Sequence, residues 1–313
     1  MTGEYPESVS VVEVLPRDGL QRHDEFVPTD EKVAMIDELS GTGVTEIEVT
    51  SFTHEEMVPN LRDAEAVFEG IERSPDVTYS ALVPNEIGME RALSVDPDKV
   101  GALITASEGY NRRNQNMTIK ENLGEVRKIA DLASGTGIIV EAGIAQAFFS
   151  PYEGRIPPEK TLSVVEAVLD AGVDEVSLAT SMGMADPRQV SELLSTVFDR
   201  WPDLDIGLHL HDTNGMSLAN VIVAMQHGVA QFDTSLCGLG GGVILPEALK
   251  SVGNTPTEDL VNMLREMGIE TGVEFHRLES VARNVTDRLG LEPTSHVLRG
   301  GTREYVLETT NEN

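Results

Sequence analysis

Side chains that could bind a metal ion or move protons stand in or directly after several hydrophobic runs of this sequence. His209 and His211 are separated by one leucine, so on a β-strand both imidazoles would point to the same side. Arg17 and Asp18 follow an earlier hydrophobic run, and Glu48 interrupts another. Because a charged side chain is rarely buried unless it is paired or coordinated, these residues are candidates for a metal centre.

The residue types indicate which ion such a centre would hold. Two imidazoles with oxygen ligands and no thiolate fit Mg²⁺ or Mn²⁺ acting with substrate oxygens, and zinc is compatible with the same ligands. Glu48 has a second interpretation, because it could be a structural carboxylate bonded to Arg17. The other histidines have no partner in the pattern and receive no role; they are His23, His54, His227, His276 and His296.

Residues this far apart in sequence can meet only if the fold gathers the ends of its strands. Eight β-rich runs recur, each followed by a helical pattern, at 9–15, 45–52, 77–83, 99–105, 137–145, 174–180, 205–211 and 230–236. Eight βα units over about 250 residues predict an α/β fold, a closed (β/α)8 TIM barrel, better than an open doubly wound sheet. In such barrels the chemistry lies at the C-terminal ends of the strands.

The sequence predicts one domain without a linker or a break in composition. The barrel would span residues 1–275, and residues 276–313 would form a short C-terminal helical extension and tail on or beside it. No glycine-rich dinucleotide fingerprint follows the first run, where the sequence PRDGLQ stands instead.

The charge of the chain excludes several classes of partner. The formal net charge is −30, from 53 acidic and 23 basic residues, of which only six are lysine. Such a field would repel nucleic acids and anionic membranes, so we expect neither as a partner. A dispersed acidic surface with little lysine is typical of a protein kept soluble at high salt, which indicates a halophilic source.

Further features predict a cytoplasmic protein. No apolar run is long enough to cross a bilayer, and the first residues lack the basic and apolar parts of a signal peptide. A single cysteine excludes an internal disulfide framework and a cysteine-based zinc site.

Several segments together resemble the 3-hydroxy-3-methylglutaryl-CoA (HMG-CoA) lyases. More widely, they resemble the divalent-metal TIM-barrel family that includes the isopropylmalate and citramalate synthases. The matching segments are VEVLPRDGLQ (12–21), ASEGYNRRNQN (106–116), PYEGRIPPEK (151–160), HLHDTNGMSLAN (209–220), GLGG (238–241) and GNTPTEDLVNML (253–264). They occur in the lyase order and cover about residues 9 to 275. The joint occurrence of PRDGLQ, HxHDT and GN-x-x-TEDL is much more specific than any one of them.

The resemblance implies a set of site residues. A divalent cation, Mg²⁺ or Mn²⁺, would be held by Asp18, His209, His211 and Asn254. Arg17 would lie against the thioester carbonyl of an acyl-CoA, and Glu48 would lie behind the metal ligands or transfer protons. Further substrate contacts would come from Gln21, Ser51 and Ser177. Similar enzymes are often dimers, so a homodimer or a larger homo-oligomer is expected.

The implied reaction is the cleavage of a 3-hydroxyacyl-CoA between C2 and C3, giving an acyl-CoA and a 3-oxo acid. Arg17 would stabilise the enolate, and Asp18 or Glu48 would accept the hydroxyl proton. Two other functions stay open. One is a Claisen-type acyltransferase or aldolase acting on a related acyl-CoA or 2-oxo acid, and the other is a metal- and ligand-binding barrel without catalysis.

The chain departs from the lyase pattern at two positions. In the lyases a cysteine follows GLGG and is thought to help protonate the enolate product, but here Gly242 follows. Family members commonly have an Asp-Thr pair after the sixth strand, whereas this chain has Thr180 and Ser181. The lone Cys237 precedes the glycines and is predicted to be a small buried hydrophobe.

Overall fold

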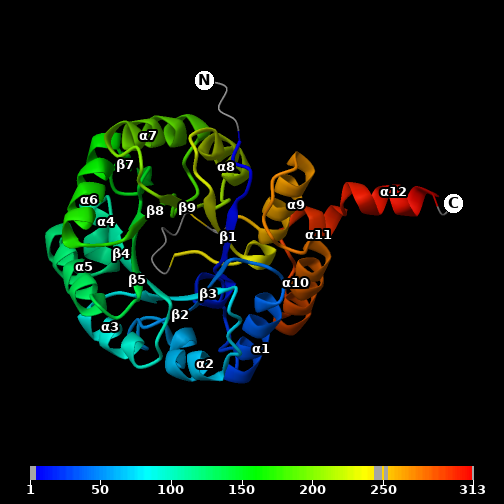
Figure 1. Cartoon of the computed structure of the whole chain (residues 1–313), viewed down its shortest axis with the longest axis horizontal. Coiled ribbons are helices and arrows are strands. Elements are labelled where there is room, and N and C mark those ends of the chain that lie inside the picture. Colours follow the sequence, from blue (N-terminus) through cyan, green and yellow to red (C-terminus); the bar gives the residue numbers. More distant parts are fainter. Residues whose placement is uncertain (1–4, 243–248, 250–252, 312–313) are drawn as a thin grey trace.

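The computed structural model describes residues 5–242, 249 and 253–311. Within these ranges, eight parallel strands close a barrel in the order β1-β10-β9-β8-β5-β4-β3-β2 (Figure 1). The strands are β1 (Ser10–Glu13), β2 (Glu46–Ser51), β3 (Thr78–Val83), β4 (Lys99–Thr105), β5 (Ile139–Ala145), β8 (Glu175–Ala179), β9 (Ile206–His209) and β10 (Gln231–Thr234). Each predicted β-rich run contains one of them, so the predicted α/β TIM barrel is confirmed.

Helices surround the barrel, as Figure 1 shows. They are α1 (Thr29–Ser40), α2 (Ala64–Gly70), α3 (Glu86–Leu93), α4 (Glu108–Asn114), α5 (Ile119–Ala133), α6 (Pro158–Ala171), α7 (Pro187–Arg200), α8 (Ser217–Gln226) and α9 (Thr257–Met267). Local sequence sets their ends. Thr118 and Asp186 begin α5 and α7 with capping boxes, and Gly172 ends α6 in the left-handed conformation that glycine favours. No described helix has the length and apolar character needed to span a membrane.

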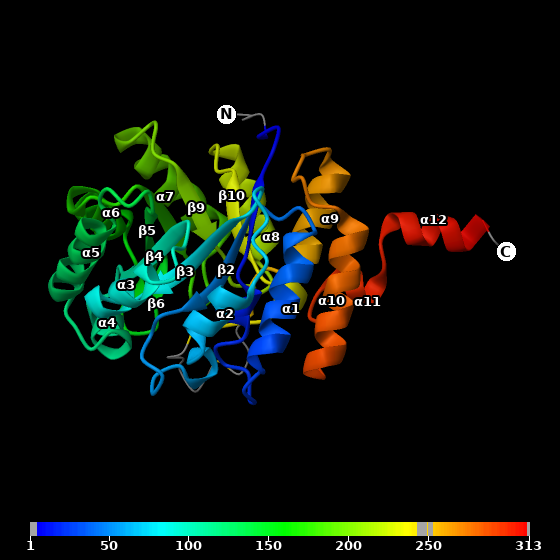
Figure 2. The same cartoon turned by 60° about the horizontal axis from the view of Figure 1, so that its bottom comes forward.

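The chain continues beyond α9 with three more helices. They are α10 (Phe275–Leu289), α11 (His296–Gly300) and α12 (Arg303–Asn311). Helix α10 buries Leu278, Val281 and Val285 and packs against α1 and α9, whereas α12 extends away from the barrel (Figure 2). The predicted boundary at 275/276 falls at the start of α10, and the division into barrel and extension stays a prediction; residues 312–313 lie outside the described part.

The interior of the barrel is polar at its N-terminal end. There Lys99 Nζ lies 3.1 Å from Glu46, 2.8 Å from Glu141 and 2.8 Å from Glu175. A cavity of about 20 Å³ above this cluster is lined from six strands, with Glu48 and Asp233 among its residues. TIM barrels are usually filled by branched apolar side chains, so charged groups replace part of the ordinary core here.

Candidate active site and metal centre

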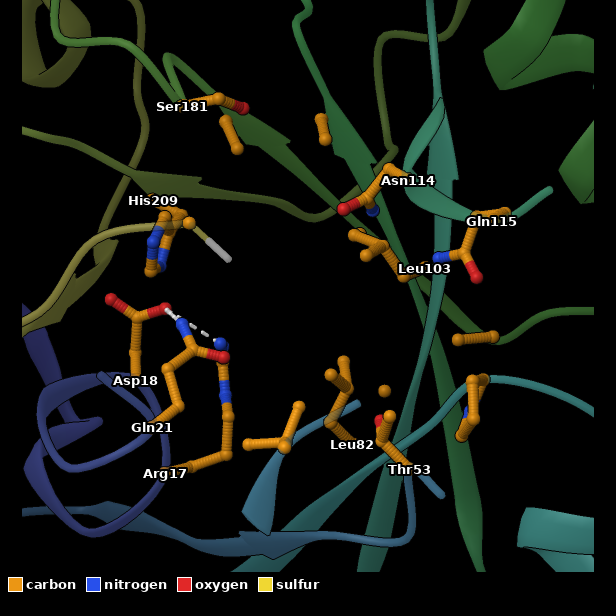
Figure 3. Close-up of a pocket in the computed structure, with 18 of the residues that line it drawn as sticks. Arg17, Asp18, Gln21, Thr53, Leu82, Leu103, Asn114, Gln115, Ser181 and His209 are labelled. Carbon is orange, nitrogen blue, oxygen red and sulfur yellow. Dashed lines mark hydrogen bonds and ion pairs between the residues drawn. The ribbon is translucent and has the colours of Figure 1, made fainter. Parts of the chain in front are cut away.

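A cavity of about 380 Å³ opens at the C-terminal ends of the barrel strands. Figure 3 shows Asp18 and His209 on one side of it and Asn114 and Gln115 on the other. The predicted site residues that line this cavity are Arg17, Asp18, Gln21, Glu48, Ser177, His209 and His211. The barrel therefore gathers these residues where the fold class predicts the chemistry to occur.

A tight turn after β1 positions Arg17 and Asp18. Residues Leu15–Gly19 form one π-helical turn, in which Val14 O accepts hydrogen bonds from the N–H groups of Arg17, Asp18 and Gly19. Such turns occur often at functional sites, because they project neighbouring side chains in directions that an α-helix does not allow. Here both side chains point over the mouth of the barrel.

The two histidines leave β9 on one face, as the His-x-His spacing predicts. His209 Nδ1 lies 2.9 Å from Asp233 Oδ2, and the Nε2 atoms of His209 and His211 lie 3.1 Å apart. The backbone N–H of His211 donates to Thr180 Oγ1 at 2.9 Å. A carboxylate on the far nitrogen is the usual partner of a metal-binding histidine, because it orients the ring and fixes its tautomer.

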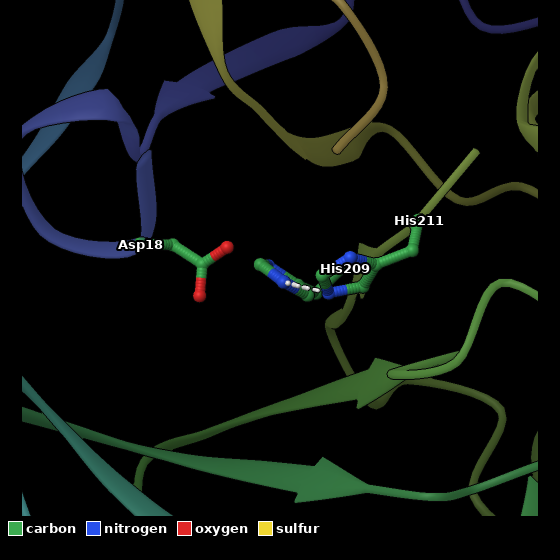
Figure 4. A group of neighbouring side chains, drawn as sticks. All are labelled: Asp18, His209 and His211. Atoms are coloured by element: carbon green, nitrogen blue, oxygen red, sulfur yellow. Dashed lines mark hydrogen bonds between the residues drawn. The ribbon is translucent and has the colours of Figure 1, made fainter. Parts of the chain in front are cut away.

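Asp18 connects the histidines to the rest of the site. Its Oδ1 accepts from Arg17 Nη1 at 2.7 Å and from Gln21 Nε2 at 2.5 Å. Its Oδ2 accepts from Gly241 N at 3.0 Å and from Asn254 Nδ2 at 2.6 Å. One ligand atom from each of Asp18, His209 and His211 lies within 4.8 Å of the others (Figure 4). These three residues therefore form a cluster of the size that one cation could bridge.

Asn254 supplies the observation that tests this cluster for a cation. Its Nδ2 donates to Asp18 and to Leu239 O, while its Oδ1 is buried and has no hydrogen-bond partner among the described residues. A buried oxygen without a donor is unfavourable in a protein interior. Beside a carboxylate and two imidazoles it fits a divalent cation, because oxygen and imidazole ligands suit such ions.

The protonation states also suit metal ligands. Burial opposes the charge on Asp18, but Arg17 and the two histidines outweigh it and hold the pKa of Asp18 well below its usual range. Burial, and then the charge of His209, lower the pKa of His211 to about 3. For His209, burial disfavours the cation, but Asp233 more than compensates and raises the pKa. The cluster thus combines an ionised carboxylate with a neutral imidazole.

Arg17 and Glu48 form an ion pair on the wall of the cavity. Arg17 Nε lies 2.5 Å from Glu48 Oε2, so the structure contains the ion pair that the structural interpretation of Glu48 predicts. Burial raises the pKa of Glu48, and Arg17 counteracts only part of that shift. Because Glu48 also lines the cavity, it stays a candidate for proton transfer although it pairs with Arg17.

The three predicted substrate contacts differ in their surroundings. Gln21 donates to Asp18 and to Gly241 O, the latter at 2.9 Å, so it links Asp18 to the glycine run. Ser177 lines the cavity directly. Ser51 is buried, and its hydroxyl pairs with Thr53 Oγ1 at 2.7 Å, so Thr53 is the one of the two that lines the cavity.

The glycine run packs directly against Asp18 and Asn254. A Cβ at Gly240 would lie 2.2 Å from Asn254 Nδ2 and 2.4 Å from Asp18 Oδ2, so only glycine fits there. Gly242 lines the cavity, whereas Cys237 is fully buried and is absent from the lining. The prediction of a buried Cys237 is therefore confirmed. Of the residues between Gly242 and Gly253, only Leu249 lies in the described part.

Sequence reasoning missed part of the site. The cavity wall also includes Asp233 from β10 and His54, Tyr110, Arg113 and Asn114 from the segments after β2 and β4. Asp233 lies at an inward position of its strand, and the others follow barrel strands, so the rule that found Asp18 would have found them too.

Comparisons with known proteins agree with this architecture. Residues 8–285 match the family model described as HMGL-like. A hydroxymethylglutaryl-CoA lyase of Bacillus subtilis is 40% identical over 286 residues, which are 91% of this chain and 95% of that relative.

Two solved structures resemble the chain over almost their whole length. The HMG-CoA lyase structure from Bacillus subtilis has a TM-score of 0.90 at 40% identity, covering 94% of this chain and 98% of that one. An HMG-CoA lyase from Acinetobacter baumannii, in complex with coenzyme A and 3-methylmalate, has a TM-score of 0.90 at 36% identity, covering 95% and 96%. Because the family match spans most of the sequence and the barrel is shared with these enzymes, the chain belongs to the HMGL-like family.

Proposed function

We propose that the chain is a divalent-cation-dependent carbon–carbon lyase that cleaves HMG-CoA, or a closely similar 3-hydroxyacyl-CoA, to an acyl-CoA and a 3-oxo acid. The observation that carries this proposal is the convergence of Asp18, His209 and His211 beside Arg17 in the cavity of an HMGL-like barrel. The named HMG-CoA lyases, similar over nearly the whole chain, support the same activity.

The cation would be held by Asp18, His209, His211 and Asn254. Asp18 already accepts four hydrogen bonds, so one of its donors has to give way to the ion. The mixed oxygen and imidazole ligands, with no thiolate among them, favour Mg²⁺ or Mn²⁺ working with substrate oxygens. When bound, such an ion makes a substrate hydroxyl more acidic and holds the substrate in place.

Arg17 would stabilise the negative charge that develops on the thioester. Its Nε and Nη1 donate to Glu48 and Asp18, which fix the plane of the guanidinium. The remaining N–H groups can then donate to a carbonyl oxygen whose charge grows during cleavage. Because this interaction is stronger in the transition state than in the ground state, it accelerates the reaction.

Glu48 is the better candidate for the base that takes the hydroxyl proton. The pKa of Glu48 is raised by its burial, which brings a carboxylate closer to the working pH, whereas that of Asp18 is lowered. Asp18 therefore serves as a ligand, and Glu48 accepts the proton. Removing Arg17 would change Glu48 as well, because the two side chains form one ion pair.

The substrate class and the setting follow from several further features. The complex of the Acinetobacter baumannii enzyme with coenzyme A and 3-methylmalate supports an acyl-CoA as the substrate class of this chain. The net charge of −30 supports work at high salt, and we expect the protein to act in the cytoplasm. We expect a homodimer or a larger homo-oligomer, as in similar enzymes.

The test is an assay of purified protein with Mg²⁺ or Mn²⁺ at high salt. Release of acetoacetate and acetyl-CoA from HMG-CoA would support the lyase. Release of free coenzyme A that requires a 2-oxo acid would support the acyltransferase alternative instead. Binding of the cation without turnover of any short 3-hydroxyacyl-CoA, and without release of coenzyme A in the presence of a 2-oxo acid, would overturn both enzymatic proposals.

A further inference from the structure

The proposed cleavage requires a proton donor that the chain must supply in a new way. Breaking the C2–C3 bond leaves its electron pair on the thioester enolate, and C2 must gain a proton to become the methyl group of the product. The lyases that the sequence resembles have a cysteine after GLGG, but Gly242 has no side chain that could donate. The inference below rests on the proposed lyase function.

The acids among the described cavity residues fall into two groups. The first group contains the carboxylates and the predicted metal ligands, namely Asp18, Glu48, Glu141, Asp233, His209 and His211. The second group contains His54 and Tyr110, which are neither carboxylates nor predicted metal ligands. One of these two is therefore the stronger candidate for the donor.

His54 lies at the exposed rim of the cavity. Its ring is solvent-exposed, and its Nδ1 faces the backbone N–H of Glu56 at 3.3 Å. An enolate is a strong base that water can also protonate, so a donor that competes with bulk water is expected deeper in the cavity than its rim. The rim position therefore argues against His54.

Tyr110 lies inside the cavity wall. It is only 4% exposed, and its backbone N–H donates to Ser107 at the start of α4, so the helix fixes its position. Its ring lies beside that of Tyr152, with 6.3 Å between the centroids, and Arg113 covers the Tyr152 ring at 4.1 Å. The side chain is thus buried, and its neighbours are held in place.

The electrostatic surroundings keep Tyr110 protonated. Burial, and then Tyr152 and the charge of Asp18, raise the pKa of its phenol above its ordinary value. Tyr110 and Asp18 line the same cavity of about 380 Å³. The carbon of a thioester enolate is a stronger base than a phenolate, so transfer of the proton from oxygen to C2 remains favourable.

We propose that the hydroxyl of Tyr110 donates the proton to C2 of the acyl group, in place of the thiol that Gly242 lacks. Glu48 takes the hydroxyl proton of the substrate, the C3–O bond becomes a carbonyl, and the C2–C3 electron pair forms the enolate. The Tyr110 O–H bond then breaks as the C2–H bond forms. Glu48 releases its proton to water, and the phenolate regains one from water, so no net proton is consumed.

The experiment compares Tyr110→Phe with Tyr152→Phe. Tyr110→Phe removes one oxygen from the cavity wall, and we expect kcat for HMG-CoA to fall about 10²- to 10⁴-fold with KM nearly unchanged. Tyr152→Phe is the matched control, because Tyr152 lies beside Tyr110 but is absent from the cavity lining, and its activity should stay close to that of the wild type.

Two further readouts separate a proton donor from a structural residue. Deuterium incorporation at C2 of acetyl-CoA in D₂O, with acetoacetate present, should be lost in Tyr110→Phe and kept in Tyr152→Phe. Adding Gly242→Cys to Tyr110→Phe should restore at least part of the lost turnover, because the thiol would return where the lyases have it.

The results also distinguish the inference from the function on which it rests. Wild-type turnover and exchange that persist in Tyr110→Phe would overturn the inference and assign the proton to Glu48, while leaving the lyase intact. Equal losses in both tyrosine variants would overturn it as well. If the wild type exchanges C2 hydrogens through Tyr110 but does not cleave HMG-CoA, only the proposal that HMG-CoA is the substrate is contradicted. A wild type that does neither would contradict both proposals.

Discussion

Asp18 shows how much of this site depends on a single residue. Its carboxylate accepts hydrogen bonds from Arg17, Gln21, Gly241 and Asn254, which come from three separate segments of the chain. These donors keep the carboxylate ionised in a buried position, where burial alone would favour its neutral form. The bond between Arg17 and Asp18 also holds the guanidinium beside the candidate metal centre, so the proposed ligand and the proposed catalytic group are positioned together.

At this scale Arg17→Met should remove catalysis while leaving cation binding. Loss of one positioned donor to a developing oxyanion typically lowers kcat about 10²- to 10³-fold. The bound Mn²⁺ per chain, measured by elemental analysis, should stay near the wild-type value, because Arg17 is not a ligand. Arg188→Met on the exposed face of α7, where the side chain is 84% exposed, is the control. Normal turnover in Arg17→Met would contradict the role given to Arg17.

At the scale of elements, a second buried carboxylate anchors the turn that carries Arg17 and Asp18. Glu13 ends β1, and its Oε1 accepts from Leu15 N at 2.8 Å and Leu236 N at 3.0 Å. Its Oε2 accepts from Thr257 Oγ1 at 2.7 Å. One side chain therefore ties the π-helical turn to the segment after β10 and to the first turn of α9.

The protonation of Glu13 makes part of the stability depend on pH. Burial raises the pKa of Glu13 to about 7, although its hydrogen bonds oppose the shift. The folded protein binds the Glu13 proton more tightly than the unfolded chain, whose pKa is 4.5. The contribution of this proton to folding stability is therefore complete below pH 4.5 and is lost as pH rises through about 7. The shift corresponds to about 3 kcal/mol at most.

Glu13→Gln should weaken this pH dependence, because the amide keeps an acceptor for the two backbone donors and cannot ionise. Urea unfolding at pH 5 and pH 8 would measure it as a smaller loss of unfolding free energy than in the wild type. Burial, and to a smaller extent the charge of Glu13, raise the pKa of Glu258 to about 8, so the substitution also lessens the pH dependence that Glu258 contributes. An unchanged difference between the two pH values would show that Glu13 keeps the same charge throughout this range.

At the scale of the whole molecule, the charged groups inside the barrel contribute to folding stability and also lie next to residues of the candidate active site. Lys99 compensates Glu46, Glu141 and Glu175 at the N-terminal end, and the small cavity above it is also lined by Glu48 and Asp233. Because these groups replace apolar filling, the fold depends on their charge balance.

Lys99→Met should therefore destabilise the barrel by about 3–5 kcal/mol, since it leaves several buried carboxylates without a cation. Equilibrium unfolding in guanidinium chloride would measure the change. Lys128→Met is the matched control, because Lys128 pairs with Glu86 and Glu125 but is 48% exposed, and it should change stability by less than about 1 kcal/mol. Adding Glu141→Gln to Lys99→Met should recover part of the loss; equal stability of the two lysine variants would refute this role for Lys99.

Cation binding should also stabilise the whole fold, because the ligands come from segments that meet only in the native state. At a concentration 100-fold above its Kd, Mn²⁺ should add about 2.7 kcal/mol to the unfolding free energy. Thermal denaturation with Mn²⁺ and with excess EDTA would measure the effect. His211→Ala should abolish it, whereas His227→Ala, whose ring bonds to Ser191 outside the site, should retain it. A Mn²⁺ effect that survives His211→Ala would place the cation elsewhere.

The sequence carried enough information for the barrel and for most of its centre. Short β-rich runs, each followed by a helical pattern, predicted every barrel strand, because parallel strands that are buried on both faces read as nearly continuous hydrophobic runs. The His-x-His spacing correctly placed two imidazoles on one face, since side chains two apart on a strand share a side. The hairpin of β6 (Phe149–Ser150) and β7 (Gly154–Arg155) was not predicted, because two-residue strands leave no period to detect.

The sequence by itself determined the eight-unit fold, the pairing of His209 with His211 and the candidate ligand Asp18, because local spacing and residue type decide those features. Only the tertiary structure decided that Asp233 orients His209, that Gly240 leaves room for Asn254 against Asp18, and that Tyr110 enters the same cavity. These are contacts between segments far apart in the chain, and they depend on how the barrel closes, which no local pattern of residues encodes.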